Sequence, residues 1–391
     1  MNNGVPKKQG LYDPAYEHDS CGVGFVCNVD GSRTNDIVAK GISVLERMSH
    51  RGAVGSDPKT GDGAGILMQI PHEFLKKVCD ESKIIIPCSG KYGAGMVFLP
   101  TDRADREFCT NLFERIAIKE GLSVLGWRNV PVNDNMLGKG AKETQPVICQ
   151  VLVGCGDEGW ASPLDFERKL YIVRRQVEKY VRESAIKQKN IFYITGLSSR
   201  TLSYKGLLMP EQVRNYFVDL ADTDMKSAML LVHSRYSTNT FPTWDLAQPF
   251  RFLAHNGEIN TVRGNINWFR ARERLMSSPL FGTDIEKIKP VIVEGGSDSA
   301  TLDNVFEILT LAGRPIEHVM MMLIPNAWHN DKNMDASVKE FYKYHACIME
   351  PWDGPAAVAF TDGTNIGAVL DRNGLRPARY IVTKNGFVVT M

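Results

Sequence analysis

Cys21 is the residue of this sequence whose context best suits a nucleophile. It follows the polar triplet HDS and opens CGVGFV, which leads directly into an apolar strand. If residues 1–20 are removed, the new α-amine, with an ordinary pKa of about 7.7–8.0, can accept the thiol proton near neutral pH. No separate histidine base is then needed. The alternative is structural, because a cysteine at the start of a strand commonly serves as a small buried apolar side chain.

Two other segments contain groups suited to the charged ends of an amino acid. The polar segment HSRYSTN directly follows an apolar strand. The guanidinium of its Arg235 could bind a carboxylate through two hydrogen bonds. In GGSDS, Asp298 could bind an ammonium group, and the adjacent glycines would allow a ligand to approach closely. The alternatives are a surface arginine and an ordinary helix cap formed by serine or aspartate.

The segment FLAHNGEIN offers hydrogen-bond donors for a developing negative charge. The side-chain amide of Asn256 and the backbone N–H of Gly257 can converge on one point, as in an oxyanion hole. Asn-Gly between apolar stretches is also typical of a hairpin turn. We expect His255 to be buried and hydrogen-bonded rather than a base. The glycine-rich segment 52–65 lacks the ending of a phosphate-binding loop, so we interpret it as a loop that lines the site.

Helical and strand patterns are mixed along the whole chain without a clear linker, which favours one large domain. Apolar residues at helical spacing predict helices over 36–48, 106–120, 165–187 and 301–311. Short apolar runs predict strands over 22–29, 66–70, 96–99, 147–153, 229–232, 252–254, 356–361, 366–370, 380–383 and 387–390. Turn pairs at Asp362-Gly363 and Asn385-Gly386 indicate hairpins and therefore antiparallel sheets. We expect an irregular insert over 129–144. The strand-like run at the end indicates the front part of a longer chain.

Composition excludes several classes of protein. The 391 residues contain 46 Lys+Arg and 45 Asp+Glu, so there is no basic excess to bind a nucleic acid. None of the 8 cysteines forms a CxxC pair, which argues against a zinc ribbon or a ferredoxin-type cluster. The start has no apolar signal-peptide core, and the longest apolar run, 319–324, is too short to span a membrane. We expect a soluble, cytoplasmic protein.

Several long blocks of the sequence resemble the glutamine amidotransferase region of glutamate synthase large subunits. They include CGVGF, HRGAVGSDPKTGDGAGIL, HSRYSTNTFPTWDLAQPFRFLAHNGEINT, GGSDSATLDN and MEPWDGPAAVAFTDG. The resemblance covers nearly the whole chain. It implies a propeptide over 1–20 and an amidotransferase domain over 21–391. It also implies an α+β fold of the class II (N-terminal-nucleophile) type, a four-layer αββα sandwich with two antiparallel sheets.

The resemblance assigns the candidate residues to the hydrolysis of L-glutamine. Cys21 corresponds to the nucleophile, and Asn256 with Gly257 to the oxyanion hole. Arg235 corresponds to the residue that binds the glutamine carboxylate, and Asp298 to the one that binds its α-amino group. Some relatives have a histidine before the proline at Gln248-Pro249, so no role passes to this glutamine.

The resemblance also implies partners outside this chain. No cofactor is expected here, whereas FMN, an iron–sulfur cluster and a 2-oxoglutarate site would follow Met391. A small NADPH-dependent reductase subunit, or ferredoxin, would supply electrons. Two rival interpretations stay open: another amide hydrolase with an N-terminal nucleophile, in the manner of penicillin acylase, and a non-catalytic docking or regulatory module.

Overall fold

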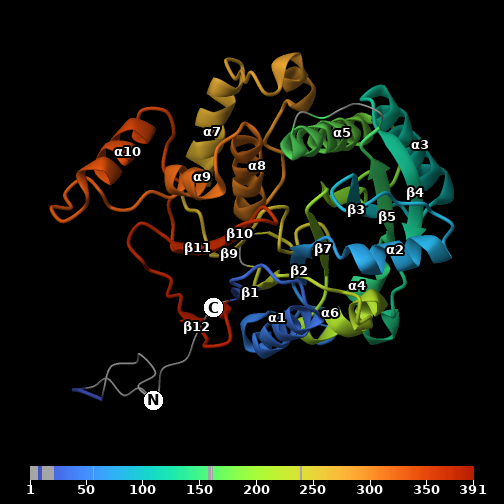
Figure 1. The fold of residues 1–391 in the computed structure, drawn as a ribbon, viewed down its shortest axis with the longest axis horizontal. Helices are drawn as coiled ribbons and strands as arrows, with labels where there is room; N and C mark the ends of the chain where they lie inside the picture. The colour runs from blue at the N-terminus through green and yellow to red at the C-terminus, as the bar shows by residue number, and fades with distance from the viewer. Residues whose placement is uncertain (1–7, 11–21, 56, 157–159, 161, 238–239) are drawn as a thin grey trace.

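The computed structural model describes residues 8–10, 22–55, 57–156, 160, 162–237 and 240–391. Cys21 and nearly all of the expected propeptide lie outside the described residues. The chain is a mixed α+β structure whose strand pairs are all antiparallel in the described part. This confirms the predicted fold class (Figure 1).

A six-stranded sheet forms the base on which the site is built. Its strands, in spatial order, are β12 (Tyr380–Val382), β13 (Phe387–Thr390), β1 (Val23–Asn28), β8 (Met229–Ser234), β2 (Ala64–Gln69) and β7 (Thr201–Gly206). Helices α1 (Asn35–Arg47) and α6 (Pro210–Tyr216) pack under this sheet (Figure 1). Leu230 and Val232 point to these helices and their fully buried side chains belong to the core there. Leu231, between them, therefore points to the opposite face.

A second sheet covers that opposite face. It consists of β11 (Ile366–Leu370), β10 (Ala356–Thr361) and β9 (Leu253–Gly257). The core between the two sheets combines Phe25 and Leu231 of the first sheet with Ala254, Ala357 and Ala359 of the second. Small alanine side chains let the two backbones approach, which brings the end of β9 close to the end of β8.

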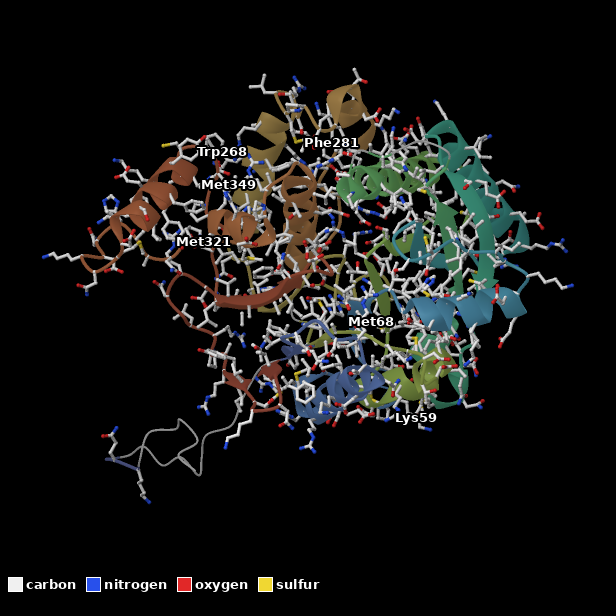
Figure 2. All side chains as sticks on the ribbon, in the orientation of Figure 1. Lys59, Met68, Trp268, Phe281, Met321 and Met349 are labelled. Carbon is white, nitrogen blue, oxygen red and sulfur yellow. The ribbon has the colours of Figure 1, made fainter. Side chains whose placement is uncertain are left out.

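Helices cover the outer face of the second sheet and complete the four layers. They are α7 (Val262–Glu273), α8 (Asp298–Leu311) and α9 (Ile316–Leu323), with α10 (Ala336–Ala346) at the periphery (Figure 1). Figure 2 shows side chains filling the space between the layers. The predicted αββα sandwich is therefore present.

A further four-stranded sheet lies beside the sandwich and was not predicted. Its order is β4 (Ser123–Asn129), β5 (Val147–Gly154), β3 (Tyr92–Leu99) and β6 (Tyr193–Ser198). Helices α3 (Arg103–Lys119) and α5 (Pro163–Glu183) pack on it. The remaining helical segments are α2 (His72–Glu81), α4 (Lys139–Glu143), η2 (Ser49–Arg51), η3 (Asp134–Met136), η4 (Val218–Ala221) and η5 (Gly282–Ile288).

Most predicted elements are found, although several begin or end up to four residues away from the predicted positions. The hairpins β10–β11 and β12–β13 form at the predicted turns. Helix α8 begins at Asp298, three residues earlier than expected, because the Ser297 side chain caps it by accepting from the N–H of Ala300. The expected irregular insert over 129–144 contains the short helix α4, whose Ala141 is fully buried.

A buried cluster of charges fixes the segment that leads into β9. Asp303 on α8 accepts hydrogen bonds from the N–H groups of Arg251 (3.3 Å) and Phe252 (2.9 Å). The Arg251 guanidinium pairs with Glu178 of α5 at 2.8 Å. Burial alone would raise the pKa of Glu178, but Arg174 and Arg251 outweigh it and lower the pKa to about 2. The cluster thus ties β9 to α5 and α8.

Candidate functional site

A pocket of about 430 Å³ opens where the ends of β8 and β9 meet the start of α8. Its walls are formed by residues 233, 235–237, 240, 248, 255–260, 262 and 296–299. Four of the five predicted site residues line this single pocket: Arg235, Asn256, Gly257 and Asp298. The fifth, Cys21, lies outside the described residues.

Gly22, the residue after Cys21, lies at the same end of the first sheet. Its carbonyl accepts a hydrogen bond from the N–H of Ser234 at 2.8 Å, and Val23 pairs with His233. A side chain at position 22 would come within 2.6 Å of the Ser234 carbonyl oxygen, so this position requires glycine. The chain therefore enters β1 directly beside Ser234 and the adjoining Arg235.

Arg235 is buried, which excludes the alternative of a surface arginine. It is 5% exposed, and burial lowers the pKa of its guanidinium, although Asp62, Asp245 and Asp298 act in the opposite direction. One terminal nitrogen, Nη2, donates to Thr240 Oγ1 at 2.7 Å. The other, Nη1, is buried and has no hydrogen-bond partner among the described residues. A buried guanidinium with a free donor is suited to an anionic ligand.

The glycine-rich segment 52–65 holds the backbone of Arg235 instead of lining the pocket. The Arg235 N–H donates to Gly63 O at 2.8 Å, and the N–H of Ala53 donates to Arg235 O at 3.2 Å. Asp62 accepts a hydrogen bond from the N–H of Ser237 at 2.6 Å. The expectation that this segment lines the site is therefore wrong for the described pocket, whose lining residues do not include it.

Asn256 and Gly257 form the end of a strand and not a hairpin turn between two strands. Both belong to β9 and pair with Ala357 and Ala356 of β10. Gly257 has φ of 118°, and a Cβ atom there would lie 1.8 Å from Pro355 O. Only glycine allows the chain to turn here while remaining packed on its neighbour. The orientation of the Gly257 peptide at the pocket is thus set by the φ angle of Gly257 and by its close packing on Pro355.

Asp298 serves both as a helix residue and as a pocket carboxylate. It is the first residue of α8, where a negative charge is favourable. Its Oδ2 accepts from the N–H of Ile259 at 2.8 Å, and its Oδ1 accepts from the N–H of Ser299 at 2.7 Å. Ser297, not Asp298, supplies the cap. The carboxylate is therefore held rigidly at the pocket wall.

Three further residues, which the sequence did not single out as functional, connect these groups. Gln248 Oε1 accepts from the N–H of His255 at 2.8 Å, and Gln248 Nε2 donates to Ser299 Oγ at 3.3 Å. Ser299 Oγ lies 3.2 Å from Asp298 Oδ1 and 2.8 Å from His255 Nδ1. A hydrogen bond to a carboxylate is stronger than one to a neutral nitrogen, so we assign the Ser299 hydroxyl as a donor to Asp298. His255 Nδ1 then carries a proton and donates to Ser299 Oγ.

Both histidines of the pocket are buried and neutral. Burial lowers the pKa of His233 to about 3 and also lowers the pKa of His255. His233 Nε2 lies 3.0 Å from His255 O and must donate to it, because a carbonyl only accepts. This confirms that His255 is a buried, hydrogen-bonded residue. Because the pKa of His233 is about 3, its imidazole is a weak base, and both rings already hold fixed hydrogen bonds, so we assign neither histidine the role of base.

The described residues contain no group of three or more His, Cys, Asp or Glu side chains arranged to bind a metal ion. Nor does any helix in the described ranges combine the length and apolar character needed to cross a membrane.

Comparison with known proteins places the chain in a family. Residues 21–391 match the model of class-II glutamine amidotransferases. The chain is 49% identical over 387 residues to the glutamate synthase (NADPH) large chain of Bacillus subtilis, covering 99% of this chain and 25% of that protein. It is 49% identical over 396 residues to glutamate synthase (NADH) of Saccharomyces cerevisiae, covering 99% of this chain and 18% of the yeast protein.

A plant relative gives the same picture. The chain is 42% identical over 386 residues to ferredoxin-dependent glutamate synthase 1 of Arabidopsis thaliana, covering 98% of this chain and 24% of that protein. The chain thus spans a quarter or less of the length of these relatives. The matched region begins at Cys21 and includes every residue of the pocket. This chain belongs to the class-II glutamine amidotransferases.

Proposed function

We propose that the chain hydrolyses L-glutamine to L-glutamate and ammonia, with residues 1–20 as a propeptide and Cys21 as the N-terminal nucleophile. The observation that carries this proposal is that Arg235 and Asp298 line the same pocket. Nη1 of Arg235, which has no hydrogen-bond partner among the described residues, offers donors for an α-carboxylate, and Asp298 offers acceptors for an α-ammonium group. A zwitterionic amino acid complements both.

The reaction would proceed in two steps. The Cys21 thiolate would attack the side-chain amide carbon, while the α-amine takes the thiol proton and passes it to the departing ammonia. Asn256 and the N–H of Gly257 would stabilise the oxyanion. Water would then attack the γ-glutamyl thioester, giving glutamate and restoring the thiol and the α-amine.

In the longer enzyme, the ammonia would serve the reductive synthesis of glutamate from 2-oxoglutarate. The relatives, named as NADPH-, NADH- or ferredoxin-dependent glutamate synthases, support this role. FMN and an iron–sulfur cluster would then be bound outside residues 1–391, and no residue of this chain is assigned to them. A small NADPH-dependent reductase subunit would be the electron-donating partner, and the cytoplasm would be the compartment.

The two rival interpretations differ from this proposal in what they require of the pocket. A general N-terminal-nucleophile amidase has no need of both Arg235 and Asp298. A non-catalytic module has no need of a buried guanidinium nitrogen that finds no partner in the described part of the chain, because leaving such a group unpaired costs free energy. The pocket therefore favours a glutamine-specific hydrolase.

Covalent labelling would test the proposal. A diazo-ketone analogue of glutamine should modify the protein once, at Cys21, and abolish glutaminase activity. Peptide mapping and N-terminal sequencing should find the label on the first residue. Cys21→Ser and a form that keeps residues 1–20 are the matched controls, and both should remain unlabelled. Full activity with the leader retained, or equal turnover of glutamine and a simple amide lacking the α-substituents, would refute the proposal.

A further inference from the structure

We propose that Gln248 is a positioning residue that couples the oxyanion-hole wall of the pocket, on β9, to the ammonium-binding wall, at the start of α8. This inference deepens the proposed function and rests on it.

Both ends of the Gln248 amide are used, and each reaches a different wall. Oε1 accepts from the N–H of His255, the residue next to Asn256, at 2.8 Å. Nε2 donates to Ser299 Oγ, on the first turn of α8, at 3.3 Å. Gln248 is buried and lines the pocket. The side chain therefore spans from the strand of the oxyanion donors to the helix of the carboxylate.

Ser299 extends this link to the carboxylate, and Ile259 closes it. Ser299 Oγ donates to Asp298 Oδ1 at 3.2 Å, and the N–H of Ile259 donates to Asp298 Oδ2 at 2.8 Å. Ile259 is two residues beyond Gly257. A closed ring of hydrogen bonds thus runs from β9 through Gln248, Ser299 and Asp298 and returns to the chain just after β9. Moving Asp298 would require breaking bonds on both sides.

The backbone before Gln248 is itself fixed by a buried lysine. Lys205 Nζ donates to Asp245 O at 2.8 Å and to Ala247 O at 2.7 Å. The ammonium also lies over the rings of Tyr193 and Phe250, 4.8 and 4.7 Å from their centres. The backbone that leads to Gln248 is therefore held rigidly, as a positioning residue requires.

The chemistry of the position explains why a neutral amide suits it. One neighbour is a backbone donor and the other is a hydroxyl whose proton is already committed to Asp298. The side chain must therefore accept at one end and donate at the other, which a carboxylate cannot do. A carboxylate would draw the Ser299 proton away from Asp298. Glutamine satisfies both neighbours at every pH at which the enzyme works.

A thermodynamic cycle between enzyme and substrate would test the coupling. Gln248→Met keeps the length of the side chain and removes both hydrogen bonds. The purified protein is assayed with L-glutamine and with glutaramate, which is glutamine without its α-amino group. If Gln248 positions Asp298, the preference in kcat/KM for glutamine over glutaramate should fall at least fivefold in Gln248→Met. Gln176→Met, which removes another buried glutamine, on α5, should keep the wild-type preference.

A pH profile supplies an independent test that a purely structural role would not affect. In Gln248→Glu the carboxyl can donate to Ser299 only when protonated, and burial raises its pKa towards neutrality. The ratio of variant to wild-type kcat/KM should therefore rise as the pH falls from 9 to 6. This test decides the question if Gln248→Met does not fold.

The outcomes separate this inference from the proposed function. Wild-type protein that hydrolyses no glutamine would refute the proposed function. Wild-type hydrolysis together with an unchanged glutamine-to-glutaramate preference in folded Gln248→Met would refute the coupling alone. A pH-independent ratio for Gln248→Glu would likewise overturn it.

Discussion

Asp298 Oδ2 accepts a hydrogen bond from the N–H of Ile259 at 2.8 Å, so the first residue of α8 is joined to the chain two residues after Gly257. The carboxylate and the oxyanion donors therefore form one rigid unit, although Asp298 lies 41 positions after Gly257 in the sequence. The effects of substitutions in the pocket depend on this rigidity.

Asp298→Asn should weaken substrate binding more than it slows the chemical step. The substitution removes a charged acceptor but retains the shape of the side chain. A hydrogen bond to a charged group contributes about 1.5–3 kcal/mol, so KM for glutamine should rise roughly 10- to 100-fold. Steady-state kinetics would measure this. Glutaramate, which lacks the α-amino group, should lose much less activity than glutamine, and a comparable loss for both substrates would contradict the assignment.

Asn256→Ala should have the opposite signature. Because an oxyanion donor acts in the transition state, its loss should lower kcat about 10²- to 10³-fold with little change in KM. Asn260→Ala, at an exposed position of the same pocket, is the matched control and should change kcat little. Near-wild-type turnover in Asn256→Ala, with an unchanged melting temperature, would remove Asn256 from the oxyanion hole.

Gly257→Ala should prevent correct folding of the site. A Cβ atom there would lie 1.8 Å from Pro355 O, and the φ of 118° is unfavourable for any other residue. Gly264→Ala is an informative control, since its Cβ would meet no atom within 4 Å and the residue lies in α7. We expect the control to be as stable as wild type or about 0.5–1 kcal/mol more stable. Thermal unfolding of both variants would check this, and equal stability of the two would be inconsistent with the geometry.

The residues that could be identified from the sequence share one property: each stands at the end of a strongly patterned element. Arg235 follows the apolar strand β8, Asn256 and Gly257 end β9, and Asp298 begins α8. Local patterns are sufficient to locate such positions. The register that brings them together, with Val23 opposite His233, depends on packing between distant segments and could not be read from the sequence.

The residues that were missed have weak local signals. Ser299 resembles an ordinary residue of a helix start, and Gln248 belongs to no helix or strand. Strand β7 alternates the apolar Leu202 and Tyr204 with polar residues, which is typical of a strand with one exposed face, yet its Ser203 and Lys205 are buried as well. Lys205 is compatible with burial because carbonyl groups and aromatic rings surround its ammonium, and that environment exists only in the folded chain. In the third sheet, β3 and β5 contain the predicted strands 96–99 and 147–153, but their pairing into a separate sheet joins distant segments and has no local signal.

Glu178→Gln should destabilise the fold strongly. The carboxylate pairs with Arg174 at 3.1 Å, Arg175 at 3.5 Å and Arg251 at 2.8 Å, and all four side chains are buried. Removing its charge leaves three buried guanidinium groups with only Glu307 and Asp303 as nearby paired anions among the described residues. Removing one partner of a buried ion pair typically costs about 3–5 kcal/mol. Glu107→Gln on α3 breaks an exposed pair and should cost less than about 1 kcal/mol. Chemical denaturation would measure both values, and similar small losses would contradict the proposed role of the buried cluster.

His233 should make the stability of the protein depend on pH in the acidic range. Its pKa is about 3 in the folded chain, below the ordinary value of 6.5, so between these pH values the unfolded chain binds the extra proton. The stabilisation is therefore complete above pH 6.5 and is lost as the pH falls, by up to about 1.4 kcal/mol per pH unit.

His233→Gln keeps a side-chain donor for His255 O but cannot titrate. Between pH 6.5 and 4.5, its free energy of unfolding should decrease by about 2–3 kcal/mol less than that of the wild type. Urea denaturation at several pH values would measure the two slopes. Parallel slopes, with the same difference in stability at every pH, would show that His233 is protonated as readily in the folded chain as in the unfolded one and that the substitution acts through packing alone.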